Sequence, residues 1–460
     1  MGRLFGTDGV RGIANADLTP ELACALGKAG AYVLGKECGK DGNAATCGGR
    51  SPVVIIGKDT RISCDMLEDG LSSGIQSTGG TVVKVGVVPT PAVAFLVRDM
   101  GADCGAVISA SHNPFEYNGI KFFNGEGFKL DDLIEEKIED IVLGGTAGDL
   151  HVSGADIGRA ADKEDDALHR YVSHLIEGMA ASLHGVRVVI DCANGAASTA
   201  AKLLFESLGA DIVMIGDNPN GVNINDGFGS TYPGAMQEAV VASGADIGLA
   251  FDGDADRLIA ADESGNLIDG DKIMYICASY LKRHDKLTGN VLTATVMSNI
   301  GLRIALEREG IGLQLADVGD RYVLELMRQT GGVIGGEQSG HIIFLDRNTT
   351  GDGLFASLRL IEALADRNVR ASEAASAVRI YPQVLRNAKV KNENKGAYVS
   401  DPEIGIAIEK VEKKYSGEGR VLIRVSGTEP LVRVMIEGPD ADAIERDAAE
   451  LAELIEKKTG

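Results

Sequence analysis

The sequence contains no tryptophan, and aromatic residues make up only 5% of it. Glycine is abundant instead, with 60 of 460 residues, and the hydrophobic fraction is 44%. This apolar content is enough to build buried cores, so a disordered chain is not expected. Few aromatics and many glycines are typical of α/β units with tight strand-to-helix turns. From the length we expect three or four domains.

Positive charge is also scarce. Lysine and arginine total 45 against 67 aspartate and glutamate residues, which gives a formal net charge of -22. Most of such a surface repels nucleic acid, so no nucleic-acid partner is expected. An anionic substrate would require arginine and lysine to be concentrated in a cleft.

The seven cysteines are scattered and include no C-x-x-C pair. This distribution argues against a zinc site and for a reduced intracellular protein. No uninterrupted apolar run approaches the roughly 20 residues of a membrane span. The first residues also lack the apolar region of a signal peptide. We therefore expect a cytoplasmic protein that does not bind membranes.

A pattern of strand, helix, strand, helix and strand occurs three times, and each third strand runs into a polar loop. Such alternation predicts mostly parallel sheets, in which ligands bind beyond the carboxyl ends of the strands. A different, small α+β domain is predicted at the end of the chain. The expected strands are 53–56, 82–88, 105–108, then 186–190, 211–215, 247–251, then 291–296, 313–318, 333–334, and finally 420–425 and 433–436, followed by a helix over 441–457.

Polar or turn-rich stretches near 144–165, 262–271 and 381–400 indicate domain boundaries. They predict four domains over 1–160, 161–261, 262–380 and 381–460.

Asp252, Asp254 and Asp256 follow the strand expected at 247–251. Carboxylates at alternate positions can converge on one point, and each close pair would repel by roughly 4 kcal/mol without a cation. All-oxygen ligands favour Mg²⁺ or Mn²⁺ over zinc. A solvated acidic turn is the alternative. Arg257 favours the metal site, because its guanidinium can contact a phosphate that the metal also contacts.

The segment Ser-Ala-Ser-His-Asn-Pro at 109–114 offers two hydroxyls and an imidazole in one turn. Adjacent Ser and His are not a hydrolase triad, and for the hexapeptide taken alone an Asn-Pro turn with incidental hydroxyls is the favoured interpretation. Lys121, on what we expect to be an exposed strand edge, is a candidate acid or base, although a solvated lysine is the commoner case.

Two further loops suit a sugar phosphate. The glycine-rich loop at 336–341 carries Glu337 and Ser339, which suit sugar hydroxyls, and His341; an ordinary turn is the alternative. The segment 424–433 predicts a phosphate clamp at a hairpin tip. Its candidate binding residues are Arg424, Ser426, Gly427, Thr428 and Arg433.

With these loops in order, the chain resembles the α-D-phosphohexomutase family over its full length. The motif at 5–12, Phe-Gly-Thr-Asp-Gly-Val-Arg-Gly, completes the pattern. The resemblance implies a four-domain architecture: three similar mixed or parallel-sheet α/β domains and a smaller C-terminal α+β domain around a central cleft. Segments 293–302 and 318–323, together with Gln338 in the loop at 336–341, resemble the branch that acts on hexosamine phosphates. The departure at Cys64, where a glycine is expected, affects no catalytic residue.

The resemblance also implies the roles of individual residues. Ser111 would be the phosphorylated serine, and its phosphorylation would be needed for activity. One Mg²⁺ per chain would be bound by Ser111, Asp252, Asp254 and Asp256. Beyond the resemblance, our hypothesis is that Arg257 supplies electrostatic stabilisation and that Lys121 is the favoured proton-transfer group, with His341 as the second choice. The substrate contacts would be Arg11, Glu337, Ser339, Arg424, Ser426, Gly427, Thr428 and Arg433.

The expected partner is a small hexosamine phosphate, and a homodimer is left open. Two alternatives remain. One keeps the chemistry but acts on glucose or mannose phosphates, and the other is a non-catalytic sugar-phosphate sensor.

Overall fold

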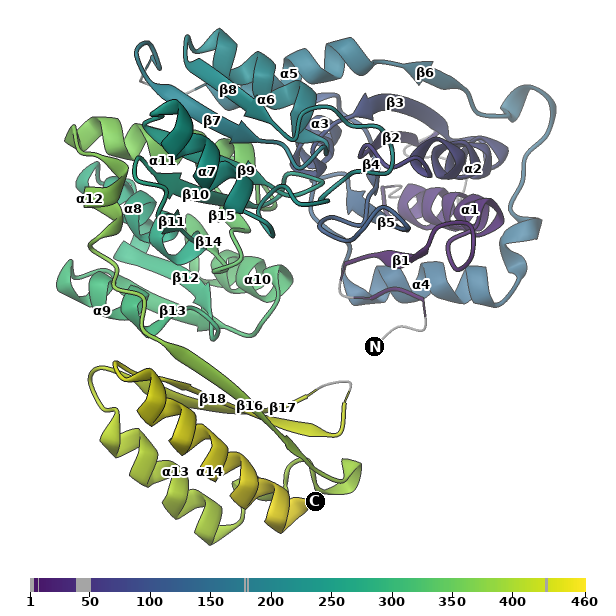
Figure 1. Cartoon of the computed structure of the whole chain (residues 1–460). Coiled ribbons are helices and arrows are strands. Elements are labelled where there is room, and N and C mark those ends of the chain that lie inside the picture. The colour runs from purple at the N-terminus through teal and green to yellow at the C-terminus, as the bar shows by residue number, and fades with distance from the viewer. Residues whose placement is uncertain (1–3, 7, 39–50, 178, 180–181, 427–428) are drawn as a thin grey trace. The chain divides into compact units, whose positions relative to one another are not determined.

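The computed structural model describes residues 4–6, 8–38, 51–177, 179, 182–426 and 429–460. The chain divides into two compact units. The first comprises residues 1–297 and 312–376, and the second comprises 298–311 and 377–460. Three sheets belong to the first unit and one to the second (Figure 1).

The first sheet has six strands in the order β1-β5-β4-β2-β3-β6. Strands β2, β3, β4 and β6 run parallel, whereas β5 pairs antiparallel with both β4 and β1. The strands are β1 (Val10–Ile13), β2 (Val53–Lys58), β3 (Thr81–Val87), β4 (Cys104–Ile108), β5 (Tyr117–Asn124) and β6 (Ala160–Asp162). The accompanying helices are α1 (Pro20–Cys38), α2 (Cys64–Ser77), α3 (Thr90–Asp99) and α4 (Asp132–Leu143), with short 3-10 turns η1 (Thr146–Asp149) and η2 (Gly154–Asp156).

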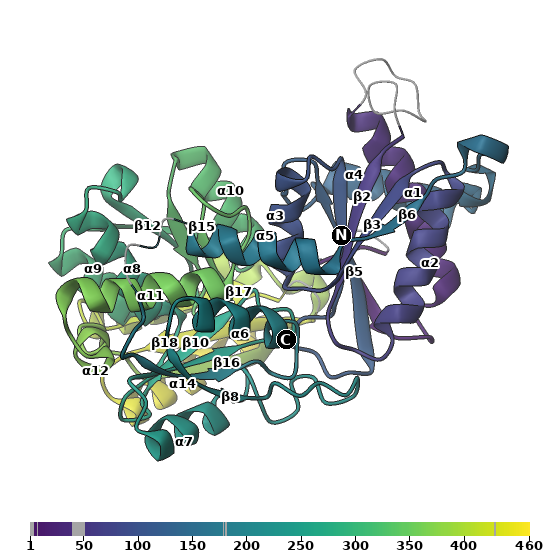
Figure 2. The same ribbon diagram turned by 90° about the horizontal axis from the view of Figure 1, so that it is seen from above.

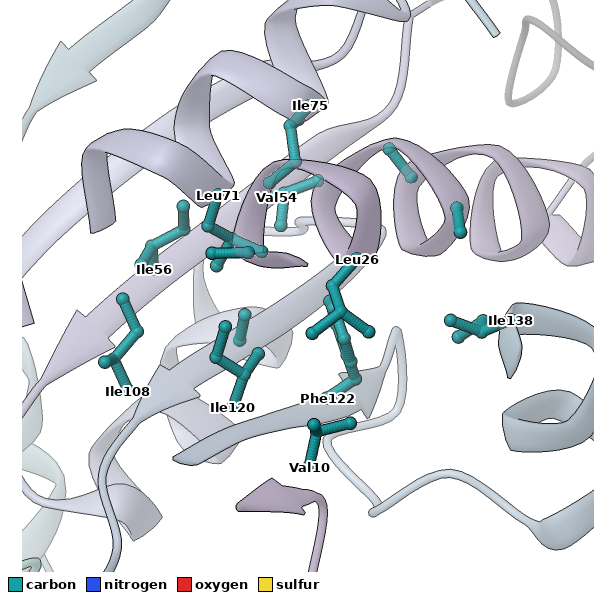
Figure 3. Packing of buried hydrophobic residues seen from close by; sticks show 14 of the residues in the cluster. Val10, Leu26, Val54, Ile56, Leu71, Ile75, Ile108, Ile120, Phe122 and Ile138 are labelled. Atoms are coloured by element: carbon teal, nitrogen blue, oxygen red, sulfur yellow. The ribbon is translucent and has the colours of Figure 1, made fainter. Parts of the chain in front are cut away.

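The main core of this part lies between the first sheet and helices α1, α2 and α4. Leu26 of α1 and Leu71 of α2 converge on Ile56 and Ile120 of the sheet (Figure 3), and all four side chains are fully buried. Each such side chain stabilises the fold by about 1.5–3 kcal/mol relative to an exposed one.

The second and third sheets are smaller. Their orders are β11-β10-β9-β7-β8 and β13-β12-β14-β15. The strands are β7 (Arg187–Asp191), β8 (Asp211–Ile215), β9 (Ile247–Phe251), β10 (Leu258–Asp262), β11 (Leu267–Ile268), β12 (Val291–Thr295), β13 (Gly312–Ala316), β14 (Ile334–Gly336) and β15 (Ile342–Phe344).

Helices flank these two sheets in the first unit. They are α5 (Glu164–Ile176), α6 (Ala197–Ser207), α7 (Gly234–Ser243), α8 (Gly270–Arg283), α10 (Asp320–Thr330), α11 (Gly353–Arg367) and α12 (Ala371–Ala375), with the 3-10 turn η3 (Thr288–Asn290). Figure 2 shows α5 between the first sheet and α6, and it packs against β3, α3 and α6.

The threefold repeat predicted from the sequence is confirmed. Three successive parallel strands in each sheet (β2, β3, β4; β7, β8, β9; β12, β13, β14) are followed by an antiparallel fourth strand, β5, β10 or β15. The three polar loops occupy equivalent places, because each connects the third strand of its sheet to the fourth. Strand β9 is buried along its whole length, as an apolar run covered on both faces should be.

The second unit contains an antiparallel sheet in the order β16-β18-β17. Its strands are β16 (Gln383–Lys389), β17 (Arg420–Val425) and β18 (Leu431–Glu437). Helices α13 (Pro402–Lys414) and α14 (Ala441–Thr459) and turns η4 (Asn392–Asn394) and η5 (Ala397–Val399) complete the C-terminal part. Helix α9 (Ile300–Arg308) joins this unit, since the Ile300 N–H donates to Glu437 Oε2 at 3.1 Å.

None of the helices that the structure describes is long and apolar enough to cross a membrane. The predicted domain boundaries at 160, 261 and 380 stay predictions.

Candidate active site

Ser111 lies in the turn that follows β4. Its side chain points at the loop 252–256 that follows β9, which we call the metal loop. Its backbone is in the left-handed region, with φ of 52°. Its Oγ donates a hydrogen bond to Asp252 Oδ2 at 2.6 Å and lies 3.3 Å from His112 Nδ1. The residue is only 2% exposed. The serine expected to carry a phosphoryl group is therefore adjacent to a carboxylate that is expected to bind a cation.

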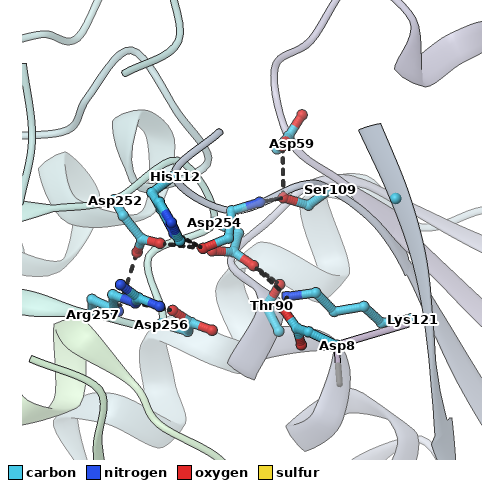
Figure 4. A network of polar contacts seen from close by, with 12 residues as sticks. Asp8, Asp59, Thr90, Ser109, His112, Lys121, Asp252, Asp254, Asp256 and Arg257 are labelled. Atoms are coloured by element: carbon cyan, nitrogen blue, oxygen red, sulfur yellow. Dashed lines mark hydrogen bonds and ion pairs between the residues drawn. The ribbon is translucent and has the colours of Figure 1, made fainter. Parts of the chain in front are cut away.

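The three aspartates of the loop after β9 are brought together as predicted. Asp252, Asp254 and Asp256 are all buried, and one carboxylate oxygen from each lies within 4.8 Å of the others. Asp254 Oδ2 accepts hydrogen bonds from Thr90 Oγ1 at 2.7 Å and from Lys121 Nζ at 3.1 Å (Figure 4). Among the residues that the structure describes, no hydrogen-bond partner reaches Oδ1 of Asp254 or Oδ1 of Asp256.

The electrostatics of this cluster are unfavourable without a cation. Burial and the neighbouring carboxylates raise the pKa of Asp252 well above its usual range, and they also raise the pKa of Asp256. For Asp254, burial acts in the same direction, but Lys121 and Thr90 outweigh it and lower the pKa. Two buried carboxylate oxygens without partners, in an all-oxygen site, fit a hard divalent cation such as Mg²⁺.

The position expected for Lys121 was wrong. We expected an exposed strand edge, but β5 is an inner strand between β4 and β1, and Lys121 is only 2% exposed. Its ammonium group lies 3.1 Å from Asp254 and 3.0 Å from Asp8. Burial alone would lower the pKa of Lys121, but these two carboxylates outweigh burial and raise it. Lys121 is therefore held in its protonated, charged form.

Arg257 and His341 lie on the other side of the acidic cluster. The Arg257 backbone N–H donates to Asp252 Oδ1 at 3.2 Å, and its Nε lies 3.9 Å from Asp256. His341 Nε2 is 3.5 Å from Asp320 and 3.8 Å from Asp256. Neither ring nitrogen of His341 has a hydrogen-bond partner in the described part of the chain, although the residue is 3% exposed.

A cavity of about 650 Å³ opens onto these residues, within the first unit. This volume suits a ligand the size of a sugar phosphate. Ser339 is exposed and lies outside the lining, whereas Glu337 lines the cavity and accepts a hydrogen bond from the Gly319 N–H at 3.2 Å. The predicted residues that line the cavity are Arg11, Ser111, Asp256, Arg257, Glu337 and His341.

Three ionic residues were missed by the sequence reasoning. Asp8, Lys129 and Asp320 extend the chain of charges that starts at Lys121, with Lys129 Nζ lying 2.9 Å from Asp8 and 2.6 Å from Asp320. Burial raises the pKa of both acids, but Lys121 and Lys129 hold the pKa of Asp8 well below its usual range. Lys129 likewise outweighs burial at Asp320 and lowers its pKa to about 2. Asp8 and Asp320 belong to the segments 5–12 and 318–323, which carry the family resemblance and so could have indicated these two residues. Nothing in the sequence distinguishes Lys129.

The predicted phosphate clamp lies in the second unit. Arg424 of β17 and Arg433 of β18 are directly opposed across the two strands. Ser426 is buried, and its carbonyl accepts a hydrogen bond from Lys395 Nζ at 3.2 Å. Lys395 is thus a further cation near the clamp that the sequence reasoning missed. Gly427 and Thr428 lie outside the described residues.

Comparison with known proteins identifies the class. Models of the phosphoglucomutase/phosphomannomutase family match residues 2–148 (α/β/α domain I), 169–265 (domain II), 269–381 (domain III) and 385–454 (C-terminal domain). The chain therefore belongs to this family, the α-D-phosphohexomutases, and the resemblance found in the sequence is confirmed.

Individual relatives narrow the comparison. A phosphoglucosamine mutase from Thermoanaerobacter sp. (strain X514) is 55% identical over 459 residues, which is 100% of both chains. A crystal structure of a phosphoglucomutase/phosphomannomutase family protein from Burkholderia thailandensis has a TM-score of 0.80 and 24% identity, and the match covers 99% of this chain and 98% of that one. The N-acetylphosphoglucosamine mutase of Aspergillus fumigatus, crystallised with GlcNAc-6P and magnesium, has a TM-score of 0.68 and 17% identity over 99% and 96% of the two chains.

Proposed function

We propose that the chain is a phosphoglucosamine mutase, which interconverts glucosamine 6-phosphate and glucosamine 1-phosphate through phospho-Ser111 and a bisphosphorylated sugar. This activity would feed the synthesis of UDP-N-acetylglucosamine. The observation that carries the proposal is the hydrogen bond of 2.6 Å from Ser111 Oγ to Asp252, inside a buried cluster of three carboxylates. The full-length relative at 55% identity supports the choice of sugar.

Ser111, Asp252, Asp254 and Asp256 would hold one Mg²⁺ per chain. When bound, Mg²⁺ neutralises charge on the cluster and on the phosphoryl group. The cation would also take up the buried oxygens of Asp254 and Asp256 that have no other partner.

In the first transfer, the bond between phosphorus and Ser111 Oγ breaks, and a bond forms from phosphorus to the C1 hydroxyl oxygen of glucosamine 6-phosphate. The hydroxyl loses its proton, and Ser111 Oγ gains one. After the bisphosphate reorients, the 6-phosphoryl group returns to Ser111 Oγ, whose proton is released while O6 is protonated. The product is glucosamine 1-phosphate, and the enzyme is again phosphorylated.

Lys121 is the favoured proton-transfer group. Its raised pKa keeps it protonated, so it is suited to give a proton to the site. His341 is the second candidate, because its ring nitrogens are buried at the cavity without hydrogen-bond partners among the described residues. Arg257, which lines the cavity, would stabilise the phosphoryl charge electrostatically.

Substrate binding is assigned to two groups of residues. Arg11, Glu337 and Ser339 would contact the sugar and its reacting phosphate. The non-reacting phosphate would be held by the clamp in the second unit, which can accept the phosphate of either isomer in turn. The clamp residues are Arg424, Ser426, Gly427, Thr428 and Arg433.

The protein is proposed to act in the cytoplasm, where its sugar-phosphate substrate would be found. A homodimer is compatible with this function but is not required by it.

The test is turnover of Ser111→Ala in a coupled assay, with glucosamine, glucose and mannose phosphates compared for the parent enzyme. We expect Ser111→Ala to lose nearly all activity while sugar-phosphate affinity changes little. Full turnover by Ser111→Ala would refute the covalent role. A parent enzyme that prefers mannose or glucose phosphate would support a phosphomannomutase or phosphoglucomutase instead, and one that binds but never turns over would be a sensor.

A further inference from the structure

One buried arginine, Arg61, donates hydrogen bonds to the carbonyl groups of the turn at 109–114, which we call the Ser111 turn. Arg61 Nη2 donates to the carbonyl oxygens of Ser111 and Asn113, each at 2.9 Å, and Nη1 donates to that of Pro114. The Arg61 side chain is completely buried. A guanidinium offers five donors in a rigid fork, which suits the binding of several carbonyls at once better than an ammonium group does.

The charge of Arg61 is balanced by Asp59, which also reaches the turn. Arg61 Nε lies 2.9 Å from Asp59 Oδ2. The same oxygen accepts a hydrogen bond from Ser109 Oγ at 2.7 Å, and Ser109 Oγ accepts one from the Ser111 N–H at 2.9 Å. Both the N–H and the carbonyl of Ser111 are therefore bonded into one network.

A second residue holds the same carbonyls from the part of the chain that forms the second sheet. Asn225 Nδ2 donates to the carbonyl oxygens of Ser111 at 3.0 Å and Asn113 at 3.1 Å. Asn225 is 4% exposed, and its own N–H donates to the Ala193 carbonyl at 2.8 Å. Hydrogen bonds therefore hold the turn from two parts of the chain. Arg61 follows β2 of the sheet that carries the turn, and Asn225 belongs to a loop next to the metal loop.

These hydrogen bonds are needed because the backbone conformation of Ser111 is intrinsically unfavourable. A φ of 52° is uncommon for a residue with a β-carbon and persists only where the surroundings enforce it. Phosphorylation would add about two negative charges beside three carboxylates, which would push the turn away from Asp252. Bonds to three carbonyl oxygens oppose that movement without touching the substrate.

We propose that Arg61 and Asn225 are positioning residues that keep the Ser111 turn in its left-handed conformation, so that the phosphoryl group on Oγ stays aligned with the metal loop. This proposal rests on the proposed phosphoserine function. Neither residue lines the cavity, so their effect is on the transfer step and not on sugar binding.

The test compares Arg61→Lys and Asn225→Ala with the parent enzyme. Arg61→Lys keeps the positive charge next to Asp59 but loses the guanidinium that donates to three carbonyl oxygens. Asn225→Ala removes the side-chain amide that donates to the carbonyl oxygens of Ser111 and Asn113. Each variant is first brought to full phosphorylation, checked by intact mass, and is then assayed for kcat and KM with glucosamine 6-phosphate. A phosphorus NMR spectrum of phospho-Ser111 reports the environment of the phosphoryl group.

We expect kcat to fall about 10- to 100-fold, as for a misplaced reacting group, with KM within about twofold and a shifted phosphorus resonance. The matched control is Arg187→Lys, because Arg187 also pairs with a carboxylate, Asp211, and donates to a backbone carbonyl, that of Ser243, but lies away from the site. It should leave kcat and the resonance unchanged.

Asn225→Ala decides the matter if Arg61→Lys does not fold. A kcat within twofold of the parent in the folded variants, with an unshifted resonance, would overturn the proposal. If that happens while Ser111→Ala is inactive, only the positioning role fails. If Ser111→Ala stays active, the phosphoserine function itself fails.

Discussion

At the residue scale, Lys121 shows how burial decides chemistry. Its ammonium group is enclosed between Asp254 and Asp8, with almost no exposure to water. The identity of the residue could be found from the sequence, but its burial could not. Burial of Lys121 arises because β1 pairs antiparallel with the outer side of β5, and no local pattern in either segment indicates that pairing.

Replacing Lys121 with glutamine should lower kcat by about 10²- to 10⁴-fold, the usual contribution of a general acid or base. The neutral amide cannot supply a proton, and it leaves Asp254 and Asp8 less well compensated. Steady-state kinetics with glucosamine 6-phosphate measure the effect, with Lys163→Gln as a control at an exposed position before α5. An unchanged kcat in a folded Lys121→Gln variant would exclude Lys121 from proton transfer.

A second residue-scale prediction concerns Asp352, which caps the N-terminus of α11 by accepting from the Phe355 N–H at 2.9 Å. Burial raises the pKa of Asp352 to about 7, although Phe355 and Tyr171 donate hydrogen bonds to it. An unfolded aspartate has a pKa of about 3.9. The folded state therefore binds more protons between these values, and the stability that Asp352 contributes at low pH is lost as the pH rises through 7.

The asparagine in Asp352→Asn cannot titrate. As the pH rises from 5 to 8, the free energy of unfolding of this variant should therefore increase relative to that of the parent. Urea unfolding midpoints at several pH values measure this difference, and Asp226→Asn in an exposed turn serves as the control. A difference between Asp352→Asn and the parent that stays the same at every pH would contradict the raised pKa.

At the scale of elements, strand positions followed from apolar runs. The predicted ranges 211–215, 247–251 and 420–425 coincide with β8, β9 and β17, and the helix expected over 441–457 is α14, which ends at Thr459. A strand carrying Lys121 was expected after the loop at 109–114 and is β5, but the antiparallel fourth strands of the second and third sheets were not predicted from the pattern. Strand β15 has only three residues, too few for a periodic signal, and its pairing with β14 is set by tertiary contacts.

The close contact between the loop after β9 and the turn that carries Ser111 gives a prediction at Gly253. A β-carbon there would lie 2.6 Å from the Ser111 carbonyl oxygen and 2.9 Å from Asn225 Nδ2, so Gly253→Ala should displace the phosphoserine turn. We expect kcat to fall at least about tenfold, which corresponds to 1.4 kcal/mol in the barrier. At Gly234 an added β-carbon meets nothing within 4 Å, so Gly234→Ala is the matched control. Equal kcat values for the two variants would show that the close contact does not position the turn.

At the scale of the whole molecule, the four polar loops predicted the family because their order and spacing extend over the full chain. The Asp252 to Asp256 cluster is a local signal that could be recognised from three alternating carboxylates. The charges contributed by Lys129 and Lys395 could not, since each meets its partner only through the folded arrangement of distant segments.

The clamp at 424–433 leads to a prediction for the molecule with its substrate bound. If this loop holds the non-reacting phosphate, amide hydrogen exchange over 420–435 should slow when glucosamine 6-phosphate and Mg²⁺ are added. Peptides from α13, in the same unit, serve as the internal reference and should not change. Unchanged exchange at 420–435 under saturating substrate would argue against a role for the clamp in binding.

The central claim is that Ser111 carries the phosphoryl group that is passed to the sugar. Intact mass combined with peptide mapping of the active enzyme tests it most directly. We expect one phosphate, located on residues 109–114, which leaves that peptide only within a single turnover, as bisphosphorylated sugar forms, and is restored to it when the product forms. A fully active enzyme with no phosphate on that peptide, or with its only phosphate elsewhere, would contradict it.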